Sequence, residues 1–145
     1  MYKIFLDTDV ILDLLLEREK FVENTRKIFR KIELREILGY TSPVILSNLY
    51  YISSNLKDKK TALSNIRKIH KILKITKIDQ KTVTDALEHG NVKDFENNLQ
   101  LYSAIEMGLD FLITRNVKDF PKTEMIKIMY PEEIVRIFEM EEKKP

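Results

Sequence analysis

The stretch at residues 2–16 reads YKIFLDTDVILDLLL, and it decides the fold class. A short apolar run at residues 2–6 ends at Asp7 and predicts a buried strand. A second apolar run at residues 10–16 follows at once and predicts a short helix. An aspartate at the end of a buried strand needs a partner for its charge, so Asp7 is either a helix cap or a metal ligand.

Short strand-like runs alternate with longer amphipathic runs along the rest of the chain. We expect further strands at residues 37–41, 74–78, 111–114 and 126–129. We expect helices at residues 21–32, 59–73, 79–87 and 94–107, and two more that begin at Ser42-Pro43 and Pro131. Strands separated by helices predict an α/β domain with three layers, α/β/α, around a central, mostly parallel sheet.

The chain of 145 residues fits one domain. Neither a repeat nor a linker divides it, so we expect a single domain over residues 1–140 and a frayed tail at residues 141–145. Apolar residues make up 43% and charged residues 33%, which is enough for a core under a solvated surface and excludes intrinsic disorder.

The composition excludes several classes of site. The sequence has no cysteine, which excludes disulfides and thiolate metal sites, and its three glycines exclude a glycine-rich phosphate loop. Asp7, Asp9 and Asp13 interrupt the N-terminal apolar stretch. We therefore expect no signal peptide, no membrane-spanning segment and no membrane partner, and a cytoplasmic location.

Charge is nearly balanced, with 25 Lys and Arg against 23 Asp and Glu. The chain as a whole is therefore not a polycation that binds nucleic acid by net charge. Residues 56–78 are locally basic, and this stretch either binds phosphates or forms a solvated helix face.

Polar side chains follow the strands at residues 2–6 and 111–114, and the carboxyl ends of parallel strands are where ligands gather. We expect Asp7, an acid from the turn at residues 94–97, and Asp119 or Asn116 to converge there on a hard ion, Mg²⁺ or Mn²⁺. Such an ion supports phosphodiester cleavage.

Five segments, in order along the chain, resemble the PIN-domain family. They are LDTDVILDLL at residues 6–15, the segment from Thr41-Ser42-Pro43 to Ile52, Asp94-Phe95-Glu96, TRNVKDF at residues 114–120 and Pro131-Glu132-Glu133. The resemblance implies the α/β sheet predicted above and a ribonuclease that depends on Mg²⁺ or Mn²⁺. Many bacterial and archaeal members are VapC-type toxins, so it also implies three partners: RNA, a cognate antitoxin and a second copy of the chain in a homodimer.

The family usually places four acids at its metal site, and Asp7 matches the first. The other three positions hold Asn48, Asn97 and Asn116. The carbonyl oxygen of an asparagine can bind a hard ion, but it brings no charge. The resemblance therefore implies that Asn97 and Asn116 act beside Asp7 in the metal and catalytic site, and that Asn48 contacts the substrate.

Acids close in sequence to these amides are candidates to complete the site. They are Asp9, Asp94, Glu96 and Asp119. We prefer Asp94 and Asp119, as ligands and catalytic groups, because Glu96 is one residue from the usual position and a helix turns about 100° per residue.

Basic and aromatic residues complete the expected site. Arg18 and Arg115 are expected to contact phosphate groups of the substrate. Tyr50 is a candidate for stacking on a base, and Tyr51 is expected to pack in the core.

Two functions remain open from the sequence. The first is a divalent-metal-dependent endoribonuclease, the toxin of a toxin–antitoxin pair. The alternative is a catalytically weak or inactive PIN scaffold that binds RNA or a protein partner, and the three amides are its motivation.

Overall fold

The computed structural model describes residues 1–144, in which strands and helices alternate. The strands are β1 (Lys3–Leu6), β2 (Leu38–Thr41), β3 (Lys74–Ile75), β4 (Phe111–Ile113) and β5 (Lys127–Met129). They form one sheet in the order β3-β2-β1-β4-β5, and every neighbouring pair is parallel. The predicted α/β class is confirmed, with a wholly parallel sheet.

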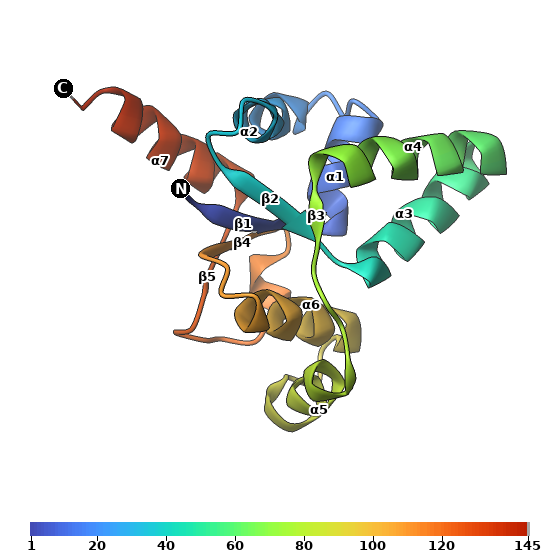
Figure 1. The fold of residues 1–145 in the computed structure, drawn as a ribbon, viewed down its shortest axis with the longest axis vertical. Helices are drawn as coiled ribbons and strands as arrows, with labels where there is room; N and C mark the ends of the chain where they lie inside the picture. Colours follow the sequence, from blue (N-terminus) through green and yellow to red (C-terminus); the bar gives the residue numbers. More distant parts are fainter. Residues whose placement is uncertain (145) are drawn as a thin grey trace.

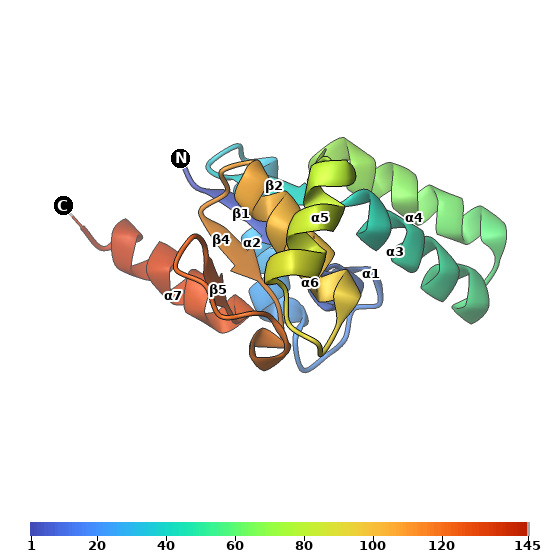
Figure 2. The same ribbon diagram turned by 90° about the horizontal axis from the view of Figure 1, so that it is seen from below.

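Helices cover both faces of this sheet. They are α1 (Thr8–Leu15), α2 (Val22–Glu33), α3 (Pro43–Leu56), α4 (Lys59–Ile72), α5 (Gln80–His89), α6 (Phe95–Glu106) and α7 (Pro131–Glu142). One face is covered by α1, α2 and α7, and the other by α5 and α6 (Figures 1 and 2). Helices α3 and α4 form a hairpin, the α3–α4 arm, which projects beyond the sheet in both views. No helix within residues 1–144 is both long and apolar enough to cross a membrane.

The central strand β1 lies in the middle of the hydrophobic core. Ile4, Phe5 and Leu6 have no exposed surface, and β1 pairs with β2 on one side and β4 on the other. Ile28 of α2 and Leu101 of α6 are also fully buried. Burial of a large apolar side chain contributes about 1.5–3 kcal/mol, so this doubly covered strand is the most strongly stabilised part of the sheet.

Local chemistry sets the boundaries of α3 and α6 as predicted. The Ser42 hydroxyl accepts a hydrogen bond from the Ile45 amide at 3.2 Å, and Pro43 is the first residue of α3. After α6, Gly108 adopts a φ of +68°, in the left-handed region that glycine tolerates.

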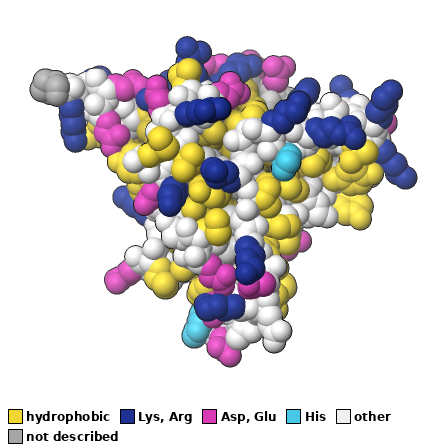
Figure 3. Space-filling view, in the orientation of Figure 1, with side chains coloured by type: hydrophobic (Ala, Val, Ile, Leu, Met, Phe, Trp, Pro, Cys, Tyr) yellow, Lys and Arg dark blue, Asp and Glu magenta, His cyan; other side chains and the backbone are white. Residues whose placement is uncertain are grey.

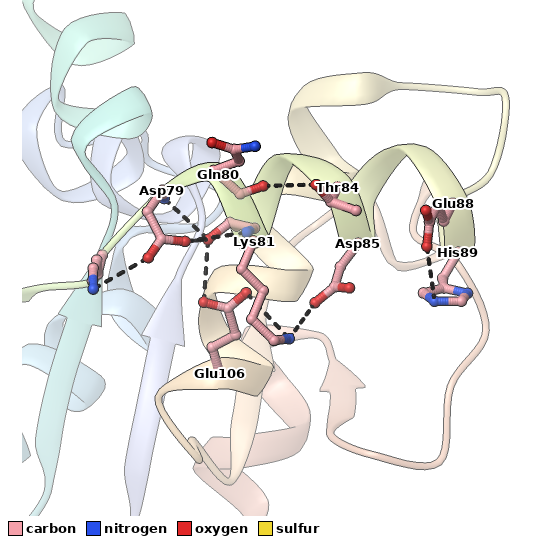
Figure 4. Close-up of polar contacts among 10 residues, drawn as sticks. Asp79, Gln80, Lys81, Thr84, Asp85, Glu88, His89 and Glu106 are labelled. Atoms are coloured by element: carbon pink, nitrogen blue, oxygen red, sulfur yellow. Dashed lines mark hydrogen bonds and ion pairs between the residues drawn. The ribbon is translucent and has the colours of Figure 1, made fainter.

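Polar contacts join α5 to α6 (Figure 4). Asp79 caps α5, and its side chain and that of Thr82 bond reciprocally to the backbone of the first turn. The Thr82 hydroxyl also lies 3.2 Å from a Glu106 carboxylate oxygen, and Lys81 pairs with Asp85 at 2.7 Å. Helix α5 therefore packs on the outside of α6 and holds it in place on its face of the sheet.

Helix α7 continues through Glu142 and so includes the first two residues of the expected frayed tail. The Lys31 ammonium of α2 pairs with Glu142 at 2.7 Å, and the Tyr2 hydroxyl donates to Glu141. These contacts hold the last turn of α7 against the body, and the boundary of the domain at residue 140 stays a prediction. Pro145 lies outside the described residues.

Candidate active site

A cavity of about 370 Å³ opens at the carboxyl edge of the sheet. Its wall comes from the start of α1, the middle of α3, the start of α6 and the loop after β4. The side chains that line it are Asp7, Thr8, Asp9, Leu12, Asn48, Tyr51, Ile52, Glu96, Asn97, Gln100 and Asn116. The predicted location of the site, at the end of β1, is where this cavity lies.

Asp7 lies at the floor of the cavity and caps α1. Its side chain accepts hydrogen bonds from the Thr8 amide and the Thr114 hydroxyl, both at 2.8 Å. The residue is only 7% exposed, and no Lys or Arg within residues 1–144 forms an ion pair with it. Burial, with the charge of Asp9, raises the pKa of Asp7 from 3.8 to about 6. The carboxylate therefore lies in an environment that favours a nearby positive charge.

Asp9 lies two residues after Asp7, in the first turn of α1, and one of its carboxylate oxygens has no partner among the described residues. Its Oδ2 accepts from the Arg115 amide and from the Asn116 side-chain amide, both at 3.1 Å. Its Oδ1 is buried and has no hydrogen-bond partner among the described residues. Burial raises the pKa of Asp9 although Arg115 opposes this. A buried carboxylate oxygen without a partner is costly, and the chemistry of this oxygen fits a hydrogen-bond donor or a cation.

Glu96 is the third carboxylate of the cavity. The Asn48 side-chain amide donates to Glu96 Oε2 at 3.2 Å, which links α3 to α6 across the opening. Behind them, the Ser42 hydroxyl is hydrogen-bonded to the side chain of Gln100. These contacts fix the width of the cavity.

The structure places Asp94 and Asp119 outside the cavity lining. Asp94 is exposed and caps α6, where its side chain accepts a hydrogen bond from the Asn97 amide at 3.2 Å. Its charge is a minor cause of the raised pKa of Asp7. Asp119 is exposed at the end of a short 3₁₀ helix, Val117–Asp119. The carboxylates that share the cavity with Asp7 are those of Asp9 and Glu96, not the two that we preferred from the sequence.

Arg18 and Arg115 are engaged by Asp13 instead of lining the cavity. The Arg115 guanidinium contacts both carboxylate oxygens of Asp13, at 2.9 and 3.2 Å, and Arg18 contacts one at 3.4 Å. Asp13 is fully buried, and Arg115 lies 3.9 Å from the centre of the Phe21 ring. A buried acid thus holds both arginines outside the cavity lining, and contact of their partly exposed side chains with phosphate groups stays a prediction.

Sequence reasoning did not assign a role to Asp13, although a signal was present. Asp13 is four residues after Asp9 on α1, and residues at this spacing share one helix face. Thr114, which bonds Asp7, directly follows β4 and was recognisable only as part of a polar loop. Together Asp13 and Thr114 set the position of the loop that carries Arg115 and Asn116.

The two tyrosines of α3 differ from expectation in their exposure to solvent. Tyr51 is 64% exposed and lines the cavity, whereas Tyr50 is half-buried. Their rings meet edge to face, with centres 5.6 Å apart. The reading of Tyr51 as a core residue was wrong, because the arm leaves that side of α3 open to solvent.

The donors of the cavity fit one hard divalent ion. Within residues 1–144, no three His, Cys, Asp or Glu side chains lie close enough to hold an ion by themselves. Mg²⁺, however, commonly takes one or two carboxylates and keeps several waters. Asp7 and Asp9 supply two carboxylates, one with an oxygen that has no partner, and Asn97 and Asn116 add amide oxygens at the wall.

Residues 3–118 match the family model of the PIN domain. The chain belongs to the PIN-domain family. Ribonuclease VapC1 of Aquifex aeolicus (strain VF5) is 32% identical to it over 135 residues, which cover 90% of this chain and 92% of that protein. The family predicted from the ordered motifs is thereby confirmed.

Solved structures show the same PIN fold. A chain of the DNA-bound VapBC complex from Salmonella typhimurium superposes with a TM-score of 0.67 and 18% identity, over 90% of this chain and 99% of that one. A chain of VapBC2 from Rickettsia felis, bound to a DNA fragment from the promoter, gives a TM-score of 0.64 at 16% identity, over 88% and 98% of the two chains.

The raised pKa of Asp7 predicts how the stability of this PIN domain depends on pH. A carboxyl group whose pKa is higher in the folded state costs stability as it ionises, so the metal-free protein is expected to lose stability as pH rises from 3.8 through about 6. The shift corresponds to a loss of up to about 3 kcal/mol. Urea denaturation in EDTA measures it. In Asp7→Asn this part of the loss should vanish, and an unchanged pH dependence in that variant would contradict the assignment.

Proposed function

We propose that this PIN-domain protein is an endoribonuclease that depends on Mg²⁺ or Mn²⁺ and acts as the toxin of a toxin–antitoxin pair. The observation that carries the proposal is the pair of aspartates, buried Asp7 and half-buried Asp9, in which the buried Oδ1 of Asp9 has no hydrogen-bond partner among residues 1–144. The similarity to Ribonuclease VapC1 over nearly the whole chain supports the reaction class.

In this proposal Asp7 and Asp9 hold the ion, with Asn97, Asn116 and Glu96 around it. When bound, the ion supplies positive charge for the phosphate in the transition state and lowers the pKa of a water. The chain itself contributes position: Thr114 orients the Asp7 carboxylate, and the backbone amide of Arg115 orients that of Asp9.

Substrate contacts come from the cavity wall. The Asn48 amide lies at the opening and donates a hydrogen bond to Glu96, so it is placed to donate to a phosphate oxygen of RNA instead. Tyr51 offers an exposed ring for stacking on a base. Asp94 lies outside the cavity and acts in this proposal through its charge rather than as a ligand.

The partners follow from the relatives. Two of the similar structures are VapBC complexes bound to DNA, and another is named a toxin–antitoxin complex from Klebsiella pneumoniae, which supports an antitoxin partner for this chain. A homodimer and a cytoplasmic location belong to the same proposal. The mass in solution, measured by light scattering, tests the homodimer.

A second function is favoured by one specific observation. The amides Asn48, Asn97 and Asn116 line the cavity at the positions where the resemblance leads us to expect acids. Fewer carboxylates attract a dication less strongly, so the alternative is a catalytically weak or inactive scaffold that binds RNA or a protein.

A cleavage assay with the full chain separates the two functions. We expect purified protein to cut RNA in millimolar Mn²⁺ or Mg²⁺, to stop in EDTA and to recover when the ion is restored. Ca²⁺, a larger ion, serves as the matched control and should support less cleavage. RNA binding without cleavage under all ionic conditions would favour the inactive scaffold.

A further inference from the structure

The largest local charge of the molecule lies on and beside α4. Residues 57–77 contain eight Lys or Arg and one Asp, a net charge of +7, although the whole chain carries only +2. The rest of the chain therefore carries −5. In the space-filling view, Lys and Arg side chains gather over α4 on the α3–α4 arm (Figure 3). This is a basic region on an otherwise acidic molecule.

Three of these cations form a line on the outer face of α4, which we call the α4 stripe: Lys60, Arg67 and Lys71. Their spacing of seven and four residues brings them to one helix face over about 16 Å. Ala62 and Ile69 turn the opposite face into the core. All three cations are exposed, and none forms an ion pair with an acid in the part of the chain that the structure describes.

The α4 stripe stabilises its helix at one end only: Lys71 lies in the last turn, where the helix dipole favours a cation, but the other positions do not favour one. The first turn of α4 holds Lys59 and Lys60 and no acid, although the amino end of a helix favours negative charge. Arg67 and Lys71 are four residues apart, a spacing at which like charges repel and destabilise a helix by about 0.2–0.5 kcal/mol. The position of Lys60 and the repulsion between Arg67 and Lys71 are therefore better explained by an external anion than by a contribution to the stability of α4.

We propose that the α4 stripe binds the phosphate backbone of RNA. This inference rests on the proposed ribonuclease function and extends it to a substrate-binding surface outside the cavity. Helix α3 packs on α4 and also carries Asn48 and Tyr51 to the cavity wall, so only α3 separates the stripe from the site of cleavage. RNA held at the α4 stripe is thereby kept close to Asp7.

The composition of the stripe favours RNA over an acidic protein. Protein interfaces are rich in aromatic residues and poor in lysine, and the α4 stripe has no aromatic residue. Backbone contacts to nucleic acid, in contrast, need little beyond Lys and Arg. The stripe is expected to bind RNA with little dependence on sequence.

The test measures RNA affinity in the absence of cleavage. In an Asp7→Asn background in EDTA, the triple variant Lys60→Gln, Arg67→Gln, Lys71→Gln is compared with Lys122→Gln, Lys127→Gln, Arg136→Gln, which makes the same charge change at exposed positions elsewhere. Fluorescence anisotropy with a labelled RNA is recorded across a range of salt concentrations.

We expect the stripe variant to bind about 100-fold more weakly at about 0.1 M salt, with a log K against log salt slope shallower by about 2. The control variant should keep the affinity and slope of the parent. Equal losses in both variants, or none in the stripe variant, would overturn the proposal. So would competition by polyglutamate as strong as that by RNA, which would indicate an acidic protein partner. This assay measures binding without cleavage, so it tests the α4 stripe separately from the proposed reaction. If the protein does not cleave RNA but the stripe contributes salt-dependent RNA binding, only the proposed reaction is refuted.

Discussion

Replacing Asp7 by asparagine is expected to lower the rate of RNA cleavage by more than about 100-fold. Loss of an outer-shell partner of a metal ligand costs about 10–100-fold, and Asp7 is proposed as a ligand itself. The substitution keeps the shape of the side chain and leaves acceptors for the Thr8 amide, so the fold should persist. In metal-free solution the variant should even be more stable at neutral pH, because it removes a buried charge.

Controls for Asp7→Asn come from the other carboxylates near the cavity. Asp9→Asn should also abolish cleavage, since it removes the second carboxylate and its free oxygen. Asp94→Asn and Asp119→Asn make the same change of charge outside the cavity lining and should each cost less than about 10-fold. Single-turnover cleavage of one RNA by all four variants provides the comparison. If Asp119→Asn were as damaging as Asp7→Asn, the ligand set proposed from the structure would be wrong.

Replacing Asp13 by asparagine is expected to destabilise the protein by about 3 kcal/mol. Removal of one partner of a buried ion pair costs about 3–5 kcal/mol, because the other charge stays behind without compensation. We expect the lower end of this range, since the side chain of Arg115 is 26% exposed and its charge still reaches water. Asparagine keeps one side-chain oxygen as an acceptor, but its NH₂ group replaces the other oxygen and faces the Arg115 guanidinium as a second donor, so one of the two hydrogen bonds from Arg115 is lost.

The exposed pair Arg26–Glu23 offers a matched control for Asp13. Its charged atoms are 2.8 Å apart, close to the 2.9 Å of Arg115 and Asp13, but both side chains are largely exposed. Glu23→Gln should therefore change the free energy of unfolding by less than about 1 kcal/mol. Urea denaturation of both variants measures the difference. Equal effects would show that burial does not decide the strength of the Asp13 contact.

Asp13→Asn should also slow cleavage, although Asp13 touches neither the cavity nor the proposed ion. The Arg115 backbone amide holds Asp9, and Asn116 beside it lines the cavity. Release of the Arg115 side chain allows this loop to move away from Asp9. A reduced cleavage rate at low temperature, where the variant is still fully folded by circular dichroism, would identify Asp13 as a positioning residue.

The secondary structure could be predicted because its determinants are local. Apolar periodicity marks α2 and α4, and the Ser42-Pro43 pair and Gly108 set helix ends through contacts within a few residues. The order of the strands could not be predicted in this way. It depends on which crossovers place β1 between β2 and β4, a choice made by packing across the whole chain.

The fold class, the family and the position of Asp7 at the end of a buried strand could all be predicted from the amino-acid sequence. These follow from periodicity, from helix boundaries and from an ordered set of motifs. The basic character of the region around α4 could be predicted as well, since charge is a property of composition.

Only the tertiary structure decided which side chains meet. Each residue along a helix turns by about 100°, so small differences in how α1, α3 and α6 pack bring Asp9 and Glu96 to the cavity and leave Asp94 outside its lining. Asp119 lies outside the lining because it ends the separate 3₁₀ helix Val117–Asp119 and is exposed there. Packing also leaves Tyr51 exposed to solvent. The buried Asp13 binds the Arg115 side chain outside the cavity lining. Contacts of this kind join residues far apart in the chain, and local sequence patterns do not encode the distance between them.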